Sequence, residues 1–241
     1  MNPKDRIILP LDESNLSDAL RLAETLHMHV GAFKVGLELV NAAGMIVFDR
    51  LKEMGVERIF YDAKLHDIPN TVAGAMRSIA KRNLWMTNLH ASGGSRMIKA
   101  AADALRESAS QNALPPPLLL GVTLLTSIGE EELRNELHVS LPPADYVKSL
   151  AKMVRNSGGD GVVASPREIE SVREACGGDF LIVTPGVRPV GSDMGDQRRT
   201  LTPSEAIRLG ADYLVIGRPI TASPNPVQAA ERILEEIAAV S

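Results

Sequence analysis

Hydrophobic residues along this chain gather in short runs, and these runs alternate with longer stretches of helical periodicity. The runs are RIILPLD, AFKVGLEL, RIFYDAKL, WMTNLHAS, PLLLGVTLL, GDGVVAS, FLIVTPGV and DYLVIGRPI. Their lengths are typical of buried strands. Between them, segments such as LSDALRLAETL, DYVKSLAKMV and AAERILEEIA place apolar residues at the spacing of one helix face. The pattern therefore predicts alternating strands and helices.

Three of the predicted helices begin with the same signal. The stretches SPREIE from Ser165, TPSEAI from Thr202 and NPVQAA from Asn225 each give a capping residue, then proline, then Glu or Gln at the third helical position. The cap oxygen accepts a free backbone N–H, the proline has no N–H to satisfy, and the Glu or Gln side chain reaches back to the cap. These signals indicate where the helices begin.

About eight strands separated by helices favour a closed (β/α)8 barrel with parallel strands and crossover helices. An open doubly wound sheet is the alternative, but such a sheet usually carries a glycine-rich first turn. The first turn here, LDESNLSD, has no G-x-G-x-x-G motif. Linker-like and low-complexity segments are also lacking. We predict an α/β protein with a single TIM-barrel domain over residues 1–241.

Composition narrows the class of protein. The 241 residues include 26 Lys and Arg against 30 Asp and Glu, for a formal net charge of -4. This balance argues against a nucleic-acid surface or a polybasic membrane patch. Apolar runs are too short to span a bilayer, and MNPKDRIILPLD becomes charged too soon for a signal peptide. The single cysteine, Cys176, is interpreted as a buried thiol in a reducing compartment. We predict a cytoplasmic protein.

Polar residues gather where the predicted strands end, which is the active-site end of such barrels. They are Asp12, Lys34, Asp62, Lys64, Asp67, Asn88, His90, Thr126, Arg188, Gly217 and Arg218. In FYDAKLHDIPNTV, the residues Asp62 and Lys64 are two positions apart and therefore point to the same face of a strand.

Each charge has a structural explanation when it is taken alone. Asp12 and Asp67 could cap the following helices, and Lys34 could extend its ammonium into solvent. His90 could be a hydrogen-bonded structural histidine. A lone Asp–Lys pair could be structural, although burying one seldom stabilises a protein. Taken together, the five charges at the ends of the first three strands (Asp12, Lys34, Asp62, Lys64 and Asp67) are better explained by chemistry than by stability.

The far side of the mouth carries features of a phosphate site. The connection TPGVRPVGSDMGDQRRT, residues 184–200, is long and rich in glycine, and such loops are usually functional. In VIGRPI, Gly217 lets a ligand approach the backbone and Arg218 can bind an anion with two N–H groups. We predict a phosphorylated substrate covered by a mobile loop. Arg198 and Arg199 are interpreted as solvated loop charges.

FYDAKLHDIPNTV resembles the signature of the orotidine 5'-monophosphate decarboxylase family, in its prokaryotic single-domain form. LPLD, FKVGLEL, GVTLLTS, TPGVRP, GDQRR and IGRPI resemble the other motifs of the family in the family's order, so that the resemblance covers almost the whole chain. It implies decarboxylation of orotidine 5'-monophosphate to uridine 5'-monophosphate and CO2, the last step of pyrimidine nucleotide synthesis. It also implies a homodimer that uses neither a metal nor an organic cofactor.

The resemblance further implies a role for individual residues. Lys64 is expected to donate a proton to C6 of the pyrimidine, and Asp62 to lie against the substrate carboxylate. Asp67 and Thr71 are expected to reach into the site of the neighbouring subunit. The remaining residues are expected to bind the rest of the nucleotide: Asp12 and Lys34 the ribose, Thr126 the base, and Arg188, Gln197, Gly217 and Arg218 the phosphate. The expected catalytic set is Lys64, Asp62, Asp67 and Lys34.

The implied reaction requires a fixed positive charge near the carbon that loses CO2. Loss of CO2 leaves a carbanion in the plane of the ring, which the π-system delocalises poorly. An ammonium at Lys64 would stabilise that charge and then supply the proton. Asp62 could either repel the substrate carboxylate or hold Lys64 charged and oriented, and the sequence does not choose between these roles.

Three rival functions share parts of this pattern. A sugar-phosphate decarboxylase or aldolase on a similar barrel would use Mg²⁺ and place a glutamate on the second strand. Lys34 stands there instead and would repel a metal, and Glu38 is a poor substitute. A non-catalytic phosphate-binding barrel does not explain the complete charged set. A phosphosugar isomerase would need a glutamate base at other strand ends, which the sequence does not offer.

Overall fold

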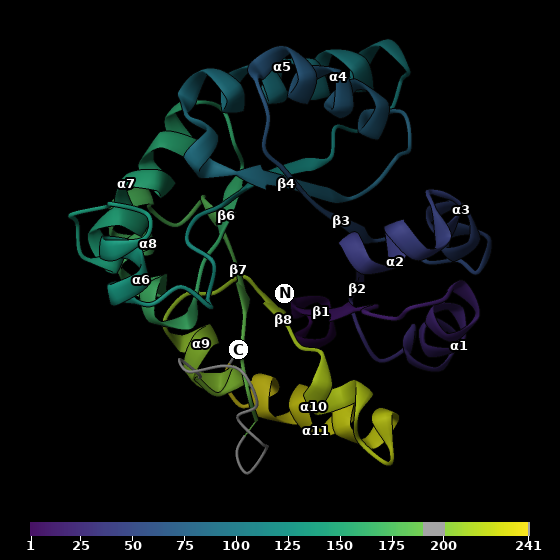
Figure 1. Cartoon of the computed structure of the whole chain (residues 1–241). Helices are drawn as coiled ribbons and strands as arrows, with labels where there is room; N and C mark the ends of the chain where they lie inside the picture. Colours follow the sequence, from purple (N-terminus) through teal and green to yellow (C-terminus); the bar gives the residue numbers. More distant parts are fainter. Residues whose placement is uncertain (190–200, 241) are drawn as a thin grey trace.

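The computed structural model describes residues 1–189 and 201–240. Within this part, parallel strands close a barrel in the order β1-β2-β3-β4-β5-β6-β7-β8. The helices surround the strands in chain order, with α4 and α5 on the side opposite α10 and α11 (Figure 1). The predicted (β/α)8 barrel is therefore confirmed, and the open-sheet alternative is wrong.

The strands are short and the helices are longer. The strands are β1 Ile7–Pro10, β2 Ala32–Val35, β3 Ile59–Leu65, β4 Met86–His90, β5 Leu118–Val122, β6 Gly161–Val163, β7 Leu181–Pro185 and β8 Tyr213–Val215. The α-helices are α1 Leu16–Leu26, α2 Leu37–Ala43, α3 Ile46–Glu53, α4 Pro69–Ala80, α5 Ser95–Gln111, α6 Glu130–Asn135, α7 Pro143–Asn156, α8 Ile169–Cys176, α9 Pro203–Arg208, α10 Arg218–Thr221 and α11 Pro226–Ala238. Three 3₁₀ turns are η1 Pro3–Arg6, η2 Ala91–Gly93 and η3 Pro166–Glu168.

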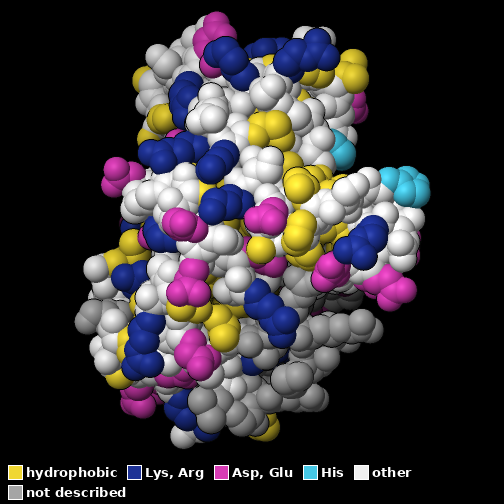
Figure 2. Space-filling view, turned by 90° about the vertical axis from the view of Figure 1, so that its left-hand side faces the viewer, with side chains coloured by type: hydrophobic (Ala, Val, Ile, Leu, Met, Phe, Trp, Pro, Cys, Tyr) yellow, Lys and Arg dark blue, Asp and Glu magenta, His cyan; other side chains and the backbone are white. Residues whose placement is uncertain are grey.

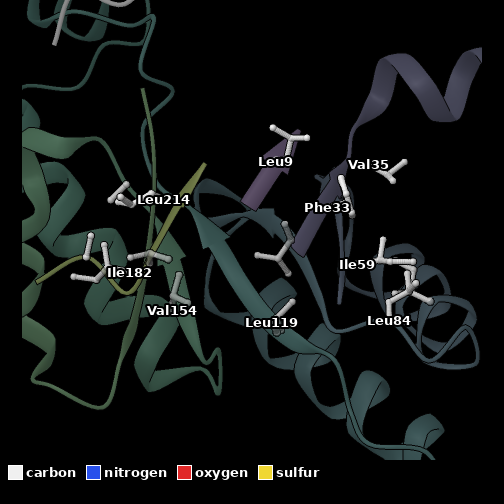
Figure 3. Close-up of a cluster of buried hydrophobic side chains, with 14 of the residues drawn as sticks. Leu9, Phe33, Val35, Ile59, Leu84, Leu119, Val154, Ile182 and Leu214 are labelled. Carbon is white, nitrogen blue, oxygen red and sulfur yellow. The ribbon is translucent and has the colours of Figure 1, made fainter. Parts of the chain in front are cut away.

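Successive side chains of each strand enter two different hydrophobic layers, because strand side chains alternate between faces. The inner layer fills the barrel with Ile8, Ala32, Phe60, Met86, Leu120, Val183 and Tyr213. The outer layer packs the strands against the helices and includes Leu9, Phe33, Ile59, Leu119, Ile182 and Leu214 (Figure 3). Each fully buried side chain of this size contributes about 1.5–3 kcal/mol to stability. The inner layer closes the barrel below its carboxyl end.

The helix starts follow the predicted signals with one difference. Thr202 and Glu205 form a capping box at α9, in which Glu205 Oε2 accepts from Thr202 N at 2.8 Å. Asn225 Oδ1 accepts from Gln228 N at 3.1 Å and caps α11. Ser165 instead caps the 3₁₀ turn η3, and α8 begins only at Ile169. The signal there marked the end of the strand correctly but not the first turn of the α-helix.

Mixed charge covers the side of the barrel formed by α6, α7 and α8. Figure 2 shows basic and acidic side chains interspersed over this face, without a continuous field of either sign. This surface agrees with the small formal net charge of -4. Among the helices within residues 1–189 and 201–240, none has both the length and the hydrophobicity of a membrane-spanning helix.

Two aspartates join neighbouring strands at the amino end of the barrel. Asp160 immediately precedes β6, and its Oδ2 accepts from Leu119 N on β5 at 2.8 Å. Asp212 immediately precedes β8, and its Oδ2 accepts from Ile182 N on β7 at 2.8 Å. The Asp212 carboxylate also pairs with Arg173 at 2.8 Å. Each carboxylate therefore supplies a strand N–H with an acceptor where the backbone ladder begins.

Asp212→Ala is expected to lower the free energy of unfolding by about 2 kcal/mol or more, because it leaves a strand N–H without its acceptor and the partly buried Arg173 guanidinium without its carboxylate partner. Urea denaturation of variant and wild type measures this loss. The matched control is Glu53→Ala, which breaks only the exposed Arg50–Glu53 pair and should change stability by less than about 1 kcal/mol. Equal effects of the two substitutions would contradict a structural role for Asp212.

Candidate functional site

The barrel interior is polar immediately above the inner hydrophobic layer, at the next inward-facing position of strands β2, β3 and β4. Lys34 follows Ala32 on β2, Asp62 follows Phe60 on β3 and Asn88 follows Met86 on β4, each by two residues. Because strand side chains alternate, the polar residues point into the barrel as the apolar ones do. Asp62 is 7% exposed and Asn88 is 0% exposed. The fold thus buries a charge and an amide where packing alone would favour hydrocarbon.

Four side chains form a chain of alternating charge across the ends of β1, β2 and β3. Lys34 Nζ lies 3.1 Å from Asp12 Oδ1 and 3.2 Å from Asp62 Oδ2. Lys64 Nζ donates to the same Asp62 Oδ2 at 2.6 Å. The Lys34 side chain is 12% exposed and the Asp12 side chain is 58% exposed. This row of four charged side chains therefore runs from the barrel interior to the solvent at the mouth.

The charges within this chain stabilise one another. Burial alone would raise the pKa of the Asp62 carboxyl, but Lys34, Lys64 and the hydrogen bonds outweigh it and hold that pKa below its ordinary 3.8. Burial alone would lower the pKa of Lys34, but Asp62 and Asp12 outweigh it and raise that pKa above 10.5. Both groups are therefore charged at neutral pH. The interpretation of Lys34 as a side chain extended into solvent is wrong.

Lys64 reaches this position through an irregular stretch of β3. Between the register pairs Tyr61–Thr87 and Leu65–Leu89, β3 has three residues where β4 has only Asn88. Lys64 lies in this bulge with φ 47°, a left-handed conformation that is uncommon for residues other than glycine. Such strain is found at functional sites, where a bulge redirects a side chain. The structure thus holds the Lys64 ammonium beside Asp62 at an energetic cost to the backbone.

Sequence reasoning missed two parts of this arrangement. Asn88 was noted at its strand end without a role, yet its Nδ2 donates to Asp62 Oδ1 at 2.7 Å. Gly36 was not noted at all, although a Cβ there would lie only 3.0 Å from Lys34 Nζ. A buried amide directly above an inward apolar residue was the signal available for Asn88. The glycine after strand β2 in FKVGLEL was the signal available for Gly36.

Two histidines lie beside the charged chain. The rings of His66 and His90 have centroids 5.5 Å apart. Burial lowers the pKa of His90 below 6.5, and the His66 ring and the Lys64 ammonium lower it further. His90 is therefore mostly neutral at pH 7. The mouth thus contains the neutral imidazole of His90 beside its two lysine charges. The structural role of His90 stays a prediction.

The aspartates that could have capped helices do not do so. The cap of α1 is Asn15, which accepts from Asp18 N at 2.9 Å, and α4 begins without a side-chain cap. Asp67 Oδ1 accepts instead from the adjacent Ile68 N at 2.6 Å. The capping interpretations of Asp12 and Asp67 are therefore wrong, and both side chains remain to be explained by the site.

The predicted phosphate residues lie at the ends of β7 and β8, which pair side by side at Pro185 and Val215. Arg188 follows β7, and its N–H donates to Leu201 O at 2.9 Å. Gly217 precedes α10, and Arg218 is the exposed first residue of that helix. Gln197, Arg198 and Arg199 lie outside the described residues.

A side chain at Gly217 would collide with the ring of Pro10. A Cβ at that position would lie 2.9 Å from Pro10 Cγ on β1, closer than such contacts allow. Glycine thus lets the β8 end pack against β1, where the charged chain begins at Asp12. Thr126 is half-buried beyond the end of β5, on the other side of the mouth.

The remaining reactive groups are the cysteine and the side chains that could bind a metal ion. Cys176 is buried at the end of α8, and burial raises the pKa of its thiol. The predicted buried thiol is confirmed. Among the residues that the structure describes, His, Cys, Asp and Glu side chains form no group of three or more that could hold a metal ion. Lys34 Nζ already lies between the Asp12 and Asp62 carboxylates that a cation would otherwise approach.

Comparison with known proteins gives consistent results over nearly the whole chain. Residues 5–233 match the model of the orotidine 5'-phosphate decarboxylase / HUMPS family. The orotidine 5'-phosphate decarboxylase of Moorella thermoacetica is 52% identical over 98% of this chain and 94% of its own. That of Syntrophomonas wolfei is 46% identical over 98% and 99%. The crystal structure of orotidine 5'-phosphate decarboxylase from Lactobacillus acidophilus superposes with a TM-score of 0.84 and 42% identity, covering 96% of this chain and 98% of the other.

Proposed function

The chain belongs to the orotidine 5'-phosphate decarboxylase / HUMPS family, and on this premise we propose that its barrel mouth converts orotidine 5'-monophosphate to uridine 5'-monophosphate and CO2. It is thus a carboxy-lyase that performs the last step of pyrimidine biosynthesis. The observation that carries the proposal is the chain of alternating charge Asp12–Lys34–Asp62–Lys64, which ends in an ammonium at the barrel mouth.

The proposed chemistry centres on Lys64. Departure of CO2 from C6 leaves a carbanion in the ring plane, and its stabilisation must come from a nearby positive charge. One ammonium about 4 Å away contributes roughly 4 kcal/mol at an effective dielectric constant near 20, or about a thousandfold in rate. Lys64 then transfers a proton from Nζ to C6. The bulge in β3 supports this role, because it presents the ammonium in a fixed direction before substrate arrives.

Asp62 acts in this proposal mainly by orienting the Lys64 ammonium. Its Oδ2 accepts from Lys64 Nζ at 2.6 Å, and this contact supports orientation more directly than repulsion of a substrate carboxylate. Asp12 and Lys34 bind the ribose hydroxyls at the outer end of the charged chain, and Thr126 places the base. Arg188, Gln197, Gly217 and Arg218 bind the phosphate, whose binding energy orients the remote reacting carbon.

A homodimer completes the site in this proposal, and each subunit functions as one domain in the cytoplasm. Asp67 and Thr71 are exposed on the isolated chain, and Ile68 between them is 67% exposed. Burial of this segment by a second subunit would remove the Ile68 side chain from water, which favours association. Asp67 and Thr71 would then enter the neighbouring site. In this proposal the reaction needs neither a metal nor an organic cofactor, because Lys64 supplies the positive charge and the proton, and Lys34 Nζ lies between the Asp12 and Asp62 carboxylates where a metal ion would bind.

Ultraviolet absorbance tests the activity directly. Purified protein is mixed with orotidine 5'-monophosphate in the presence of EDTA, and the change from orotate to uracil absorbance is followed over time. We expect turnover that is indifferent to the chelator. Absence of any change at high enzyme concentration would refute the proposal, and loss of activity specifically on adding EDTA would favour a Mg²⁺-dependent sugar-phosphate enzyme of the same family.

Arg218→Ala is expected to raise KM for the nucleotide by about tenfold to a hundredfold, because charged hydrogen bonds to phosphate are lost. The change in kcat should be smaller. Steady-state kinetics on orotidine 5'-monophosphate separate the two effects. Arg134→Ala is the matched control, because Arg134 forms an exposed ion pair with Glu130 on α6. An unchanged KM in Arg218→Ala would remove Arg218 from the phosphate site.

A further inference from the structure

Asn88 is the buried neutral residue at the centre of the charged mouth. It lies on β4 and is 0% exposed. Its amide meets β3 at two points: Nδ2 donates to Asp62 Oδ1 at 2.7 Å, and Oδ1 accepts from Lys64 N at 2.7 Å. The orientation of the amide follows from chemistry, since a backbone N–H can only donate and a carboxylate can only accept. Both polar ends of one side chain are therefore satisfied by groups of the site.

The contact between Asn88 Oδ1 and Lys64 N satisfies the backbone where β3 departs from regular pairing with β4. The bulge places three residues of β3 opposite Asn88 alone, so that the Lys64 N–H has no regular strand partner there. The Asn88 side chain supplies that acceptor. A buried N–H without an acceptor would be costly, and Lys64 already adopts the unfavourable φ of 47°. Asn88 thus stabilises the conformation from which the Lys64 side chain projects.

The contact between Asn88 Nδ2 and Asp62 Oδ1 fixes the orientation of the Asp62 carboxylate. Because Asn88 occupies Oδ1, the other oxygen, Oδ2, faces both Lys64 Nζ at 2.6 Å and Lys34 Nζ at 3.2 Å. Rotation of the carboxylate about its Cβ–Cγ bond would break the amide contact and move Oδ2 away from the lysines. One neutral donor therefore determines which oxygen faces the ammonium groups.

We propose that Asn88 is a positioning residue for the decarboxylation, which locks the Lys64 backbone and the Asp62 carboxylate together through one amide. The inference rests on the proposed function of the same site. Asparagine suits this position because it offers a donor and an acceptor without charge. Aspartate lacks the donor when it is ionised, and leucine or alanine lacks both groups.

Asn88→Ala tests the role through kinetics. We expect kcat to fall by about tenfold to a hundredfold, while KM changes less than threefold, because the residue orients the reacting groups without binding the nucleotide. The matched control is Thr87→Val. Thr87 is the adjacent residue on β4, is 0% exposed, and has a buried hydroxyl without a hydrogen-bond partner. This near-isosteric substitution should leave kcat unchanged.

Asn88→Asp separates positioning from simple packing through its pH profile. The charged and titratable groups that face Asp62 are Lys34 from β2, Lys64 from β3 and His90 from β4. Two adjacent carboxyls share a proton, so that the pKa of the pair is raised. At low pH the protonated carboxyl replaces the amide donor; as the pH rises, the donor is lost and the two carboxylates repel each other.

The kcat of Asn88→Asp relative to wild type is therefore expected to fall by about tenfold between pH 5 and pH 8. Dividing by the wild-type kcat at each pH removes the effect of substrate phosphate ionisation, because that effect is the same for both proteins. A constant ratio over this range, or a kcat of Asn88→Ala within threefold of wild type, would overturn the inference. Wild-type turnover in the same assay establishes the proposed function separately, so that an active wild type with unaffected variants overturns the role of Asn88 alone.

Discussion

Lys64→Ala is expected to lower kcat by at least about a thousandfold while the protein stays folded. The substitution removes both the charge that stabilises the carbanion and the proton that quenches it. Folding should survive because Asp62 keeps its contacts with Lys34 at 3.2 Å and with Asn88 at 2.7 Å, so that no buried carboxylate is left unpaired. Alanine can also occupy the left-handed backbone conformation about as well as lysine.

Single-turnover kinetics and urea denaturation together measure these two expectations. Lys99→Ala is the matched control, because Lys99 forms an exposed ion pair with Asp103 on α5. Its kcat should equal that of wild type. Near-normal kcat in Lys64→Ala would show that another group donates the proton. A Lys64→Ala protein that is unfolded would contradict the argument that the remaining charges satisfy one another.

Mixing two inactive variants is expected to restore activity if Asp67 serves the site of the neighbouring subunit. Lys64→Ala and Asp67→Ala should each be nearly inactive alone. In a dimer of one subunit of each kind, one site combines the intact Lys64 of the Asp67→Ala chain with the intact Asp67 of the Lys64→Ala chain. Random re-pairing of equal amounts would repair about one quarter of all sites. The assay follows decarboxylation by the mixture after mild dissociation and reassociation.

The control mixture combines Lys64→Ala with Asp62→Ala. Lys64 and Asp62 are joined within one chain at 2.6 Å, so that neither site of the mixed dimer is complete and activity should stay at the background level. Recovery of activity in this control mixture would show that activity can return without a site shared between two subunits. Failure of the Asp67→Ala mixture, with subunit exchange verified by differently tagged chains, would place Asp67 in its own subunit's site or outside the site.

The fold followed from the sequence because its signals are local. Apolar runs alternated with helical periodicity, and the structure closes these runs into the predicted barrel. Within FYDAKLHDIPNTV, Phe60 enters the inner layer and Tyr61 packs outward against Phe48, with ring centroids 5.0 Å apart. The 3₁₀ turn after Ser165 was not predictable in the same way, because the same cap and proline can begin either kind of turn.

The site followed from the sequence only in part. Strand alternation predicted Asp62 and Lys64 on one face, and the structure joins them at 2.6 Å through the bulge in β3. The barrel geometry brings Asp12 and Lys34 to them. The two capping interpretations failed because Asn15 caps α1 and α4 has no side-chain cap. Asn88 was overlooked because its role depends on a bulge between β3 and β4, and a sequence pattern does not reveal the register of strands far apart in the chain.

By itself, the sequence determined the barrel, the ends of its strands and the set of charged residues at its mouth, because side-chain period and turn chemistry act over a few residues. Only the tertiary structure decided which atoms of that set meet. Asp62 Oδ2 faces both lysines, Asn88 holds Oδ1 and the Lys64 N–H, and Gly36 leaves room for Lys34 Nζ. These contacts depend on cross-strand register and on a left-handed residue in β3, which arise only when distant strands pack together.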